Sequence, residues 1–249
     1  MKPYVLYTFI FALLIAHGSA MAEEQGNEPL EFGHIEIPPF GYTDSEGNSR
    51  GHLIRLTRQV FAQMGLSPRF QSYPAARLYR LLRSGKTAFT LGAAKLHALR
   101  EVAYESQEST ATLALTIYHR QESPAIANLK GLKGKRVALI RGYSYGPVGK
   151  YFEEHSDAMT IEYALNQESA LNMLTYKRVD YLLNYQKPTE NLIAQKGITD
   201  LKGTVIGRTS VHFFVSREVK NAESIRDAWD RELRNLKKLD KIPAFQLHE

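Results

Sequence analysis

The chain has 249 residues, of which 43% are hydrophobic and 23% are charged, with 32 Lys and Arg against 26 Asp and Glu and no cysteine. These fractions are ordinary for a globular protein, and they exclude a disordered chain, a collagen-like fibre and a protein with many membrane spans. The absence of cysteine from the sequence excludes disulfides, thiolate metal sites and a cysteine nucleophile.

Residues 1–22 have the features of a secretory signal peptide. Lys2 precedes an uncharged apolar run over residues 5–16, and residues 20–22 (AMA) offer the small side chains that a signal peptidase reads. A run of about 12 apolar residues is shorter than the roughly 20 that are needed to cross a bilayer, which favours a signal peptide. The alternative interpretation of this segment is an uncleaved anchor helix. We therefore expect cleavage near residue 22 and a mature protein in the periplasm of a two-membrane bacterium.

The first half of the mature chain alternates strand and helix signals. Apolar side chains at helical spacing from Leu53 to Met64, followed by Gly65, predict one helix, and the leucines between Pro74 and Ser84 predict a second. Short apolar runs bounded by turn residues predict the strands between these helices. The predicted strands cover residues 32–37, 69–72, 89–94 and 113–119.

The second half restarts this pattern. Strands are predicted over residues 136–140, 181–184 and 211–216. Helices are predicted after the glycine-rich loop 142–149, after the capping residue Asn166, around Leu192, and from Ile225 to Leu236. Two α/β halves of roughly 100 residues each fit two lobes better than one large sheet.

Nucleotide and metal sites are not expected. Residues 84–87 (SGKT) end like a P-loop, but that motif needs a glycine where Arg80 stands and a strand that leads into the loop. The end of a helix followed by a strand explains the string better. The histidines of the mature chain show no H-x-x-x-H or other ligand spacing, so the sequence predicts no metal site and no cofactor.

Residues 142–146 (GYSYG) form a G-x-S-x-G string between a predicted strand and a predicted helix, as a hydrolase nucleophile elbow requires. Asp180 or Asp200 and then His212 follow in hydrolase order. No His-Gly-Gly oxyanion segment precedes the string, and His212 lies in an apolar strand pattern, so a serine hydrolase is the less favoured reading. The same loop offers free backbone N–H groups at a helix N-terminus, which suit a carboxylate or a phosphate.

Several short strings, each weak alone, occur in a fixed order along the mature chain. They are PPFGY at 38–42, LLRSGK at 81–86, LKGKRV at 132–137, the segment from Leu174 to Asp180, and the segment from Leu233 to Ile242. The ordered set resembles the family 3 extracellular solute-binding proteins, the type 2 periplasmic binding proteins of amino-acid ABC transporters. The resemblance runs from about Ile35 to Phe245.

This resemblance implies an α/β fold of two lobes joined by a hinge of two crossing segments, near residues 117–121 and 207–210. The first lobe is discontinuous and consists of residues 23–118 and 209–249. The second lobe consists of residues 119–208. A ligand is expected in the cleft between the lobes, where strand ends and helix N-termini converge.

The resemblance also implies ligand-binding positions. Counted without a gap from Gly85, the family's carboxylate-binding arginine falls on Arg100. An arginine suits this role because its guanidinium donates two parallel hydrogen bonds to a carboxylate. A surface ion pair of Arg100 with Glu101 is the alternative, and core packing is the alternative for Phe40. The other implied ligand-binding residues are Phe40, Tyr42, Tyr73, Arg77, His97, Ser144, Tyr145 and Tyr185.

Three positions depart from the family pattern. His97 replaces a threonine, Ala88 replaces a buried acid, and Tyr185 replaces the acid that receives the ammonium group of an amino acid. An ammonium group without a carboxylate partner is expensive in a closed cleft, although Asp44 or Glu190 are candidate substitutes. The expected ligand is therefore an amino acid or a related small carboxylate, such as a modified amino acid, an opine or a short peptide.

The predicted mechanism is ligand binding coupled to closure of the lobes, with an ABC permease or a membrane sensor as the partner that reads the closed form. The alternative is a periplasmic enzyme on the same scaffold, similar to cyclohexadienyl dehydratase, with His97 as its acid or base. We favour a binding protein in which His97 is neutral and donates a hydrogen bond, over an enzyme in which it is the acid or base. We expect a monomer without affinity for nucleic acid, because no basic run with interleaved aromatic residues occurs.

Overall fold

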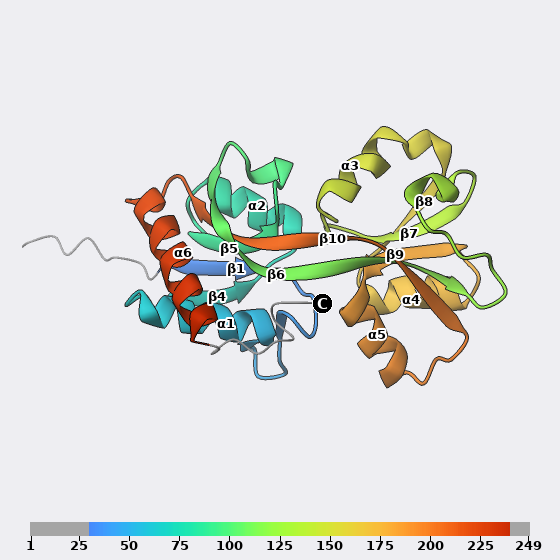
Figure 1. Ribbon diagram of the computed structural model, residues 1–249, viewed down its shortest axis with the longest axis horizontal. Helices are drawn as coiled ribbons and strands as arrows, with labels where there is room; N and C mark the ends of the chain where they lie inside the picture. The colour runs from blue at the N-terminus through green and yellow to red at the C-terminus, as the bar shows by residue number, and fades with distance from the viewer. Residues whose placement is uncertain (1–29, 240–249) are drawn as a thin grey trace, which may run out of the picture.

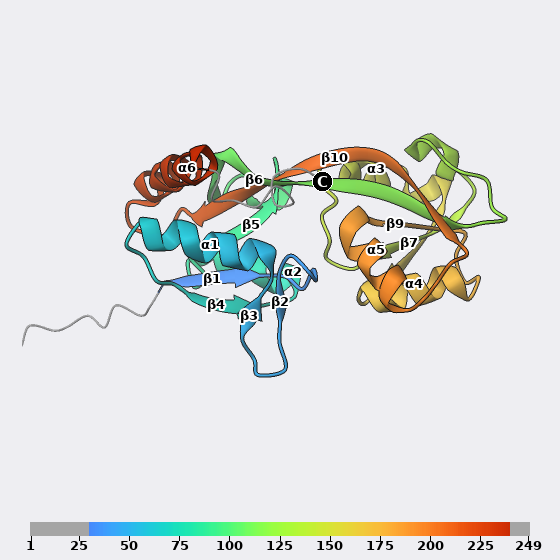
Figure 2. The same ribbon diagram turned by 60° about the horizontal axis from the view of Figure 1, so that its bottom comes forward.

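The structure is a computed structural model that describes residues 30–239. The predicted signal peptide, residues 1–22, lies outside the described residues. Two lobes lie side by side and are joined by the long strands β6 (Ala103–Arg120) and β10 (Leu201–Ser216) (Figures 1 and 2). The fold is therefore the two-lobe α/β arrangement expected from the sequence.

The first lobe contains three short parallel strands and three helices (Figure 1). Its strands are β1 (Glu31–His34), β4 (Arg69–Ser72) and β5 (Phe89–Ala93). Its helices are α1 (His52–Gln63), α2 (Ala75–Arg83) and α6 (Ala222–Lys238). A hairpin of β2 (Tyr42–Thr43) and β3 (Ser49–Arg50) follows β1, and the short 3₁₀ turn η1 (His97–Leu99) follows β5.

The second lobe repeats the arrangement with different residues (Figure 1). Its strands are β7 (Arg136–Ile140), β8 (Thr160–Ala164) and β9 (Tyr181–Tyr185). Its helices are α3 (Pro147–Glu154), α4 (Gln167–Thr175) and α5 (Gln186–Gln195). The 3₁₀ turn η2 (Leu129–Leu132) precedes β7, and η3 (Ser156–Ala158) lies between α3 and β8. The sequence did not predict β8.

The two lobes share one hydrogen-bonded sheet, with the strand order β4-β1-β5-β10-β6-β9-β7-β8. β6 and β10 pair antiparallel along most of their lengths and extend well beyond the apolar runs 113–119 and 211–216. The expectation of two lobes was right, but their sheets are continuous because these two strands belong to both. The predicted boundaries at 118/119 and 208/209 fall within these strands and stay a prediction.

Each lobe has a hydrophobic core, and a further cluster of buried residues spans both lobes. In the first lobe Phe61 packs edge-on against Trp229 of α6, and the Trp229 ring stacks on Phe213 of β10 with a centroid separation of 4.0 Å. In the second lobe aliphatic side chains such as Leu171 and Leu182 are fully buried. Burial of these faces holds the helices against the sheet, since apolar burial is the main stabilising term of folding.

Local sequence signals explain where several helices begin and end. Asn166 caps α4 by accepting from the backbone N–H of Ser169, and the Ser169 hydroxyl accepts from the Asn166 backbone in return. Gly85 adopts a left-handed φ of 71° after α2, and β5 begins at Phe89. The SGKT string is therefore a helix end followed by a strand, as the sequence predicts.

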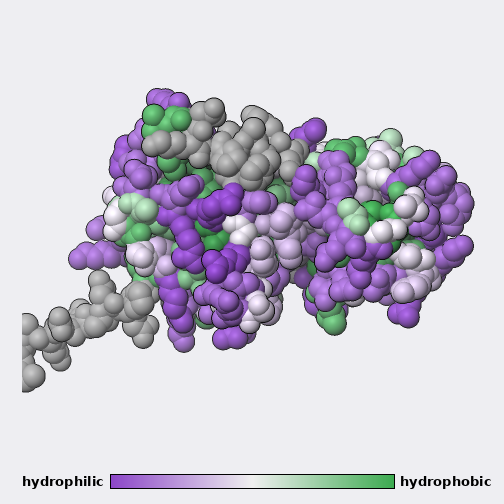
Figure 3. Space-filling view, turned by 90° about the horizontal axis from the view of Figure 1, so that it is seen from below, coloured by the Kyte–Doolittle hydropathy of each residue, from purple (hydrophilic) through white to green (hydrophobic). Residues whose placement is uncertain are grey.

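Hydrophilic side chains predominate on the face seen in Figure 3, where hydrophobic ones form scattered patches. None of the helices between residues 30 and 239 combines the length and the apolar character that a membrane span needs. Within the same residues, no group of three or more His, Cys, Asp or Glu side chains is placed to hold a metal ion.

Candidate functional site

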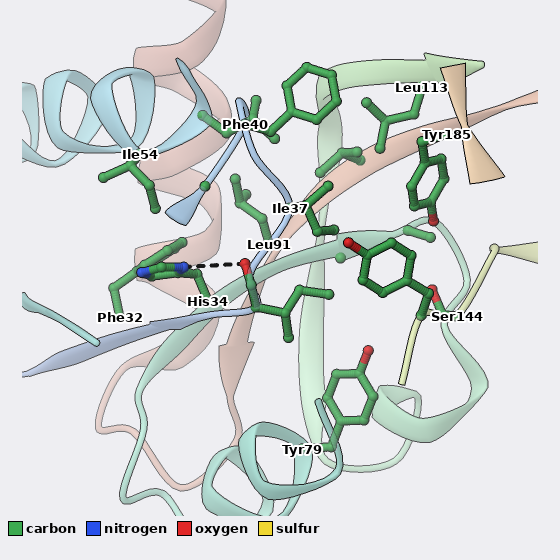
Figure 4. A pocket seen from close by; sticks show the side chains of 17 residues that line it. Phe32, His34, Ile37, Phe40, Ile54, Tyr79, Leu91, Leu113, Ser144 and Tyr185 are labelled. Atoms are coloured by element: carbon green, nitrogen blue, oxygen red, sulfur yellow. Dashed lines mark hydrogen bonds between the residues drawn. The ribbon is translucent and has the colours of Figure 1, made fainter. Parts of the chain in front are cut away.

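A cavity lies between the lobes, where the ends of β1 and β5 face the ends of β7 and β9 (Figure 4). The first lobe contributes five residues between positions 34 and 41, Tyr79 of α2 and the end of β5, while the second contributes Tyr143, Ser144 and Tyr185. The space inside it that a water-sized sphere can enter measures about 80 Å³. That is room for several water molecules, and strand ends are the usual place for small-molecule sites in α/β folds.

The loop between β7 and α3 reaches this cavity because two glycines adopt conformations that other residues avoid. Gly142 and Gly146 have φ values of 84° and 58°. A Cβ atom on Gly142 would lie 3.0 Å from the Cβ of Ala75, and one on Gly146 would lie 2.6 Å from the Oγ1 of Thr209. Both glycines therefore let the loop lie directly against α2 and β10.

Tyr143 joins the two lobes beside the cavity. Its hydroxyl donates a 3.0 Å hydrogen bond to the carbonyl oxygen of Glu36 in the first lobe, and it accepts one of 3.0 Å from Nε2 of Gln167 in α4. Burial raises the pKa of Tyr143 well above its ordinary value, so the hydroxyl keeps its proton at neutral pH. The hydrogen bond to Glu36 joins the lobes, and the one from Gln167, which lies in the same lobe as Tyr143, positions the hydroxyl.

Tyr143, Tyr145 and Tyr185 form a triangle of rings with centroid separations of 5.8 to 5.9 Å. Tyr145 is buried behind the cavity wall, and its hydroxyl accepts a 2.7 Å hydrogen bond from the backbone N–H of Ile140. Burial raises the pKa of Tyr145 and of Tyr185. Tyr145 therefore supports the two tyrosines that line the cavity.

His34 is the lining residue whose ordinary pKa lies near neutrality. Its Nε2 lies 2.8 Å from the Ser49 hydroxyl, and its Nδ1 lies 3.3 Å from the carbonyl oxygen of Ile35. Burial lowers the pKa of His34 below its ordinary value, which favours the neutral imidazole. A proton on Nδ1 suits the Ile35 carbonyl and leaves Nε2 to accept from Ser49.

Hydroxyl groups gather at one end of the cavity. The side chains of Tyr79, Ser144 and Tyr185 point toward the same space in Figure 4. Within the described part of the chain the Tyr79 hydroxyl has no hydrogen-bond partner, and burial raises its pKa to about 12. The opposite end is apolar, with Phe32, Ile37 and Leu91 among its walls.

Three of the residues implied by the family resemblance line this cavity: Phe40, Ser144 and Tyr185. Tyr42 lines a separate groove between the β2 end of the first lobe and α4 and α5 of the second. The roles of these residues in ligand binding stay predictions.

The other implied positions lie outside the cavity lining. The Tyr73 hydroxyl donates a 2.9 Å hydrogen bond to the buried carboxylate of Glu31, and the Arg77 guanidinium lies 5.1 Å from the centroid of the Tyr73 ring. His97 of η1 and the adjacent Arg100 are exposed. The structure does not bring Arg100 to the cavity wall, and its role as a carboxylate ligand stays a prediction.

Neither candidate substitute acid reaches the cavity lining. Asp44 accepts a 2.7 Å hydrogen bond from Nε of Arg50 within the β2–β3 hairpin, and Glu190 accepts one of 2.8 Å from Gln186 within α5. None of the 17 lining residues is Asp, Glu, Lys or Arg. The cavity wall is therefore uncharged when His34 is neutral.

The residues of the hypothetical hydrolase triad are not assembled. His212 uses Nδ1 in a 2.8 Å hydrogen bond with the carbonyl oxygen of Ser106, and its Nε2 lies 3.0 Å from the Ser210 hydroxyl. Asp180 pairs with Arg136 at 2.9 Å. His212 and Asp180 are therefore engaged with other partners and do not form the expected triad with Ser144.

Sequence reasoning missed Tyr79, Tyr143 and His34 as lining residues. Two of them carried a usable signal, because His34 ends the first strand and Tyr143 follows the strand β7, and ligand sites gather at such strand ends. Tyr79 lies in the middle of α2, and only the packing of that helix directs its side chain to the cavity.

Solved structures with this fold include proteins of several kinds. A histidine kinase sensor domain with similarity to periplasmic binding proteins is 20% identical, with a TM-score of 0.75 over 88% of this chain and 94% of that one. An ancestral arginine-binding protein bound to arginine is 21% identical, with a TM-score of 0.71 over 86% and 96%. A substrate-binding protein of an ABC uptake transporter from Streptococcus pneumoniae, with bound histidine, is 18% identical, with a TM-score of 0.71 over 86% and 89%.

At these identities the likeness shows the fold alone. The comparison with curated protein sequences returned no match. The sequence model of the bacterial extracellular solute-binding proteins, family 3, matches residues 32–246, which is most of the chain. This protein therefore belongs to the family 3 bacterial extracellular solute-binding proteins.

Proposed function

We propose that the mature chain is a periplasmic solute-binding protein that captures a small organic molecule between its lobes and presents the closed form to a membrane partner. The observation that carries this proposal is the cavity itself, because both lobes contribute its walls. A ligand that contacts both walls binds the closed form better than an open one, and this differential affinity is what couples binding to closure.

The partner is an ABC permease or a membrane sensor. The substrate-binding protein from Streptococcus pneumoniae supports uptake, and the histidine kinase sensor domain supports sensing. The periplasmic address is supported by the family match and by the signal-peptide features of residues 1–22.

An amino acid or a related small carboxylate is the ligand class that the family resemblance implies, and the similar structures with bound arginine or histidine support it. The uncharged cavity lining supports it less well, because a buried carboxylate needs hydrogen-bond donors or a cation. We propose Phe40, Ser144 and Tyr185 as ligand contacts. Tyr42, Tyr73, Arg77, His97, Arg100 and Tyr145 complete the set proposed from the sequence.

Binding is tested by thermal-shift screening of the mature protein against amino acids, short peptides, organic acids and uncharged aromatic amides, with calorimetry on every compound that stabilises it. Small-angle scattering with and without that compound measures closure. We expect at least one compound to raise the melting temperature and to reduce the radius of gyration. If no compound in the four classes stabilises the protein, solute capture is contradicted.

A matched pair of variants locates the site. Ser144→Tyr places a large side chain in the cavity, whereas Ser45→Tyr adds the same side chain at an exposed turn. We expect Ser144→Tyr to abolish binding and Ser45→Tyr to retain it. Equal binding by the two variants would contradict the assignment of this cavity.

The role of Arg100 is tested with a carboxylate-bearing ligand. If Arg100 holds the carboxylate, Arg100→Ala reduces affinity by at least about tenfold, since charged hydrogen bonds contribute roughly 1.5–3 kcal/mol. Unchanged affinity contradicts this role.

A further inference from the structure

We propose that the cavity selects an uncharged ligand, a small molecule with an aromatic ring or similar apolar body and one hydroxyl, carbonyl or amide group. This inference rests on the proposed function of solute capture and names the chemical class of the solute. It departs from the charged amino acids and carboxylates that the family resemblance implies.

The first argument is the charge of the lining. The 17 residues of the wall include no acidic or basic side chain other than His34, whose imidazole is buried and held by Ser49 and Ile35. The position where the family places the acid that receives an ammonium group is Tyr185, whose phenol is buried in the wall. A zwitterion would lose the hydration of two charges without gaining a charged partner for either, which strongly disfavours its burial.

The second argument is the hydrogen-bonding capacity of the polar end of the cavity. The hydroxyl groups of Tyr79, Ser144 and Tyr185 face one space, and each can both donate and accept a hydrogen bond. The Tyr79 hydroxyl has no partner among the described residues. A neutral amide, which also donates and accepts, can use this cluster in full, whereas an ammonium group or a carboxylate would have hydroxyls but no opposite charge as partners.

The third argument is the apolar remainder. Aromatic rings line the cavity from both lobes, with Phe32 and Phe40 on one side and Tyr143 and Tyr185 on the other. Leu91 and Leu113 add aliphatic surface to the lining. Flat ring systems gain offset and edge contacts from such walls in addition to the burial of apolar surface.

The test uses three compounds that share one ring and differ in charge: benzamide, benzoate and benzylamine. Calorimetry and ligand-observed NMR on the mature protein measure their affinities. Indole-3-acetamide and indole-3-acetate repeat the comparison with a larger ring. We expect each amide to bind at least about tenfold more tightly than its charged counterparts, because only the charged compounds leave a buried charge unpaired.

Two variants locate the selectivity in the hydroxyl cluster. Tyr79→Phe and Ser144→Ala each remove one hydroxyl with little change of shape, and we expect each to weaken amide binding about three- to tenfold. Tyr176→Phe makes the same change as Tyr79→Phe at a side chain that is 69% exposed in the second lobe, and it should leave affinity unchanged. Circular dichroism establishes that each variant is folded.

Three results overturn the inference. Benzoate or benzylamine binding as tightly as benzamide contradicts selection against charge. Binding of an amino acid with no binding of either amide also contradicts it, while solute capture itself stands. If no compound of any class binds, both the inference and the proposed function fail.

Discussion

The two lobes build their walls of the cavity in different ways. The first lobe presents the ends of β1 and β5, which are held by an aromatic core around Phe61 and Trp229. The second lobe presents tyrosines from the β7–α3 loop and the end of β9, which are held by glycine conformations and single hydrogen bonds. Both walls belong to hydrophobic cores, since Tyr145 and Tyr185 are buried in one, but aromatic packing positions the first wall and glycine conformations with hydrogen bonds position the second.

The strongest test of this contrast is the core of the first lobe. Trp229 is fully buried, so Trp229→Ala should lower the free energy of unfolding by about 3–5 kcal/mol. Ile225→Ala, on the same helix at a partly buried position, is the control and should have a smaller effect. Urea denaturation measures both. Equal losses for the two variants would mean that the aromatic stack does not organise this lobe.

The second test concerns the glycine at the end of the β7–α3 loop. Gly146 and Gly197 both have left-handed φ values, but an added Cβ meets Thr209 only at Gly146 and meets nothing within 4 Å at Gly197. Gly197→Ala should lower stability by about 1–2 kcal/mol through backbone strain alone. Gly146→Ala should lower it by at least about 1 kcal/mol more and weaken ligand binding. If Gly146→Ala binds ligand with unaltered affinity, the exact position of the β7–α3 loop is not required for ligand binding.

The third test breaks the contact between the lobes. Tyr143→Phe keeps the ring and removes the hydroxyl that links Glu36 to Gln167. We expect the closed form to lose about 0.5–1.5 kcal/mol, which small-angle scattering would detect as a larger average radius of gyration without ligand. Tyr176→Phe is the exposed control. The same scattering profile for wild type and Tyr143→Phe would rule out this hydroxyl as a link between the lobes.

The smallest expected effect is the pH dependence that arises from His34 in the first lobe. Burial lowers the pKa of His34 in the folded state, so the unfolded state binds more protons once the pH falls below about 6.5. The stability that depends on neutral His34 is therefore fully present at a pH above the pKa of the unfolded state. It is lost as the pH falls toward the pKa of His34 in the folded state. His34→Gln should flatten the decline in stability between about pH 7 and about pH 5, measured by urea denaturation. An unchanged slope would assign the decline to other groups.

Local sequence signals predicted most elements of both lobes. The Asn166 cap, the strand 136–140 and the helix carrying Trp229 all lie where the sequence places them. The polar half of β6, residues 103–112, could not be recognised, because its side chains lack an apolar strand pattern and its backbone becomes a strand by pairing with β10. Long-range pairing overrode local propensity there.

The candidate site was harder to predict than the fold. Ser144 and Tyr185 could be assigned from family strings and strand ends, and both line the cavity. Tyr79 could not be assigned, because nothing in the sequence other than its place in a helix distinguishes it from neighbouring residues. The exposed setting of Arg100 likewise depends on how η1 packs against α2.

The sequence by itself determined most of the strands and helices, the family and the presence of two lobes, because these depend on short-range patterns of apolar residues, glycines and caps. Tertiary structure decided the continuous sheet, the hydrogen bonds from Tyr143 to Glu36 and Gln167, and the uncharged character of the cavity. Those features depend on which distant side chains meet after folding, and packing across the two lobes selects them.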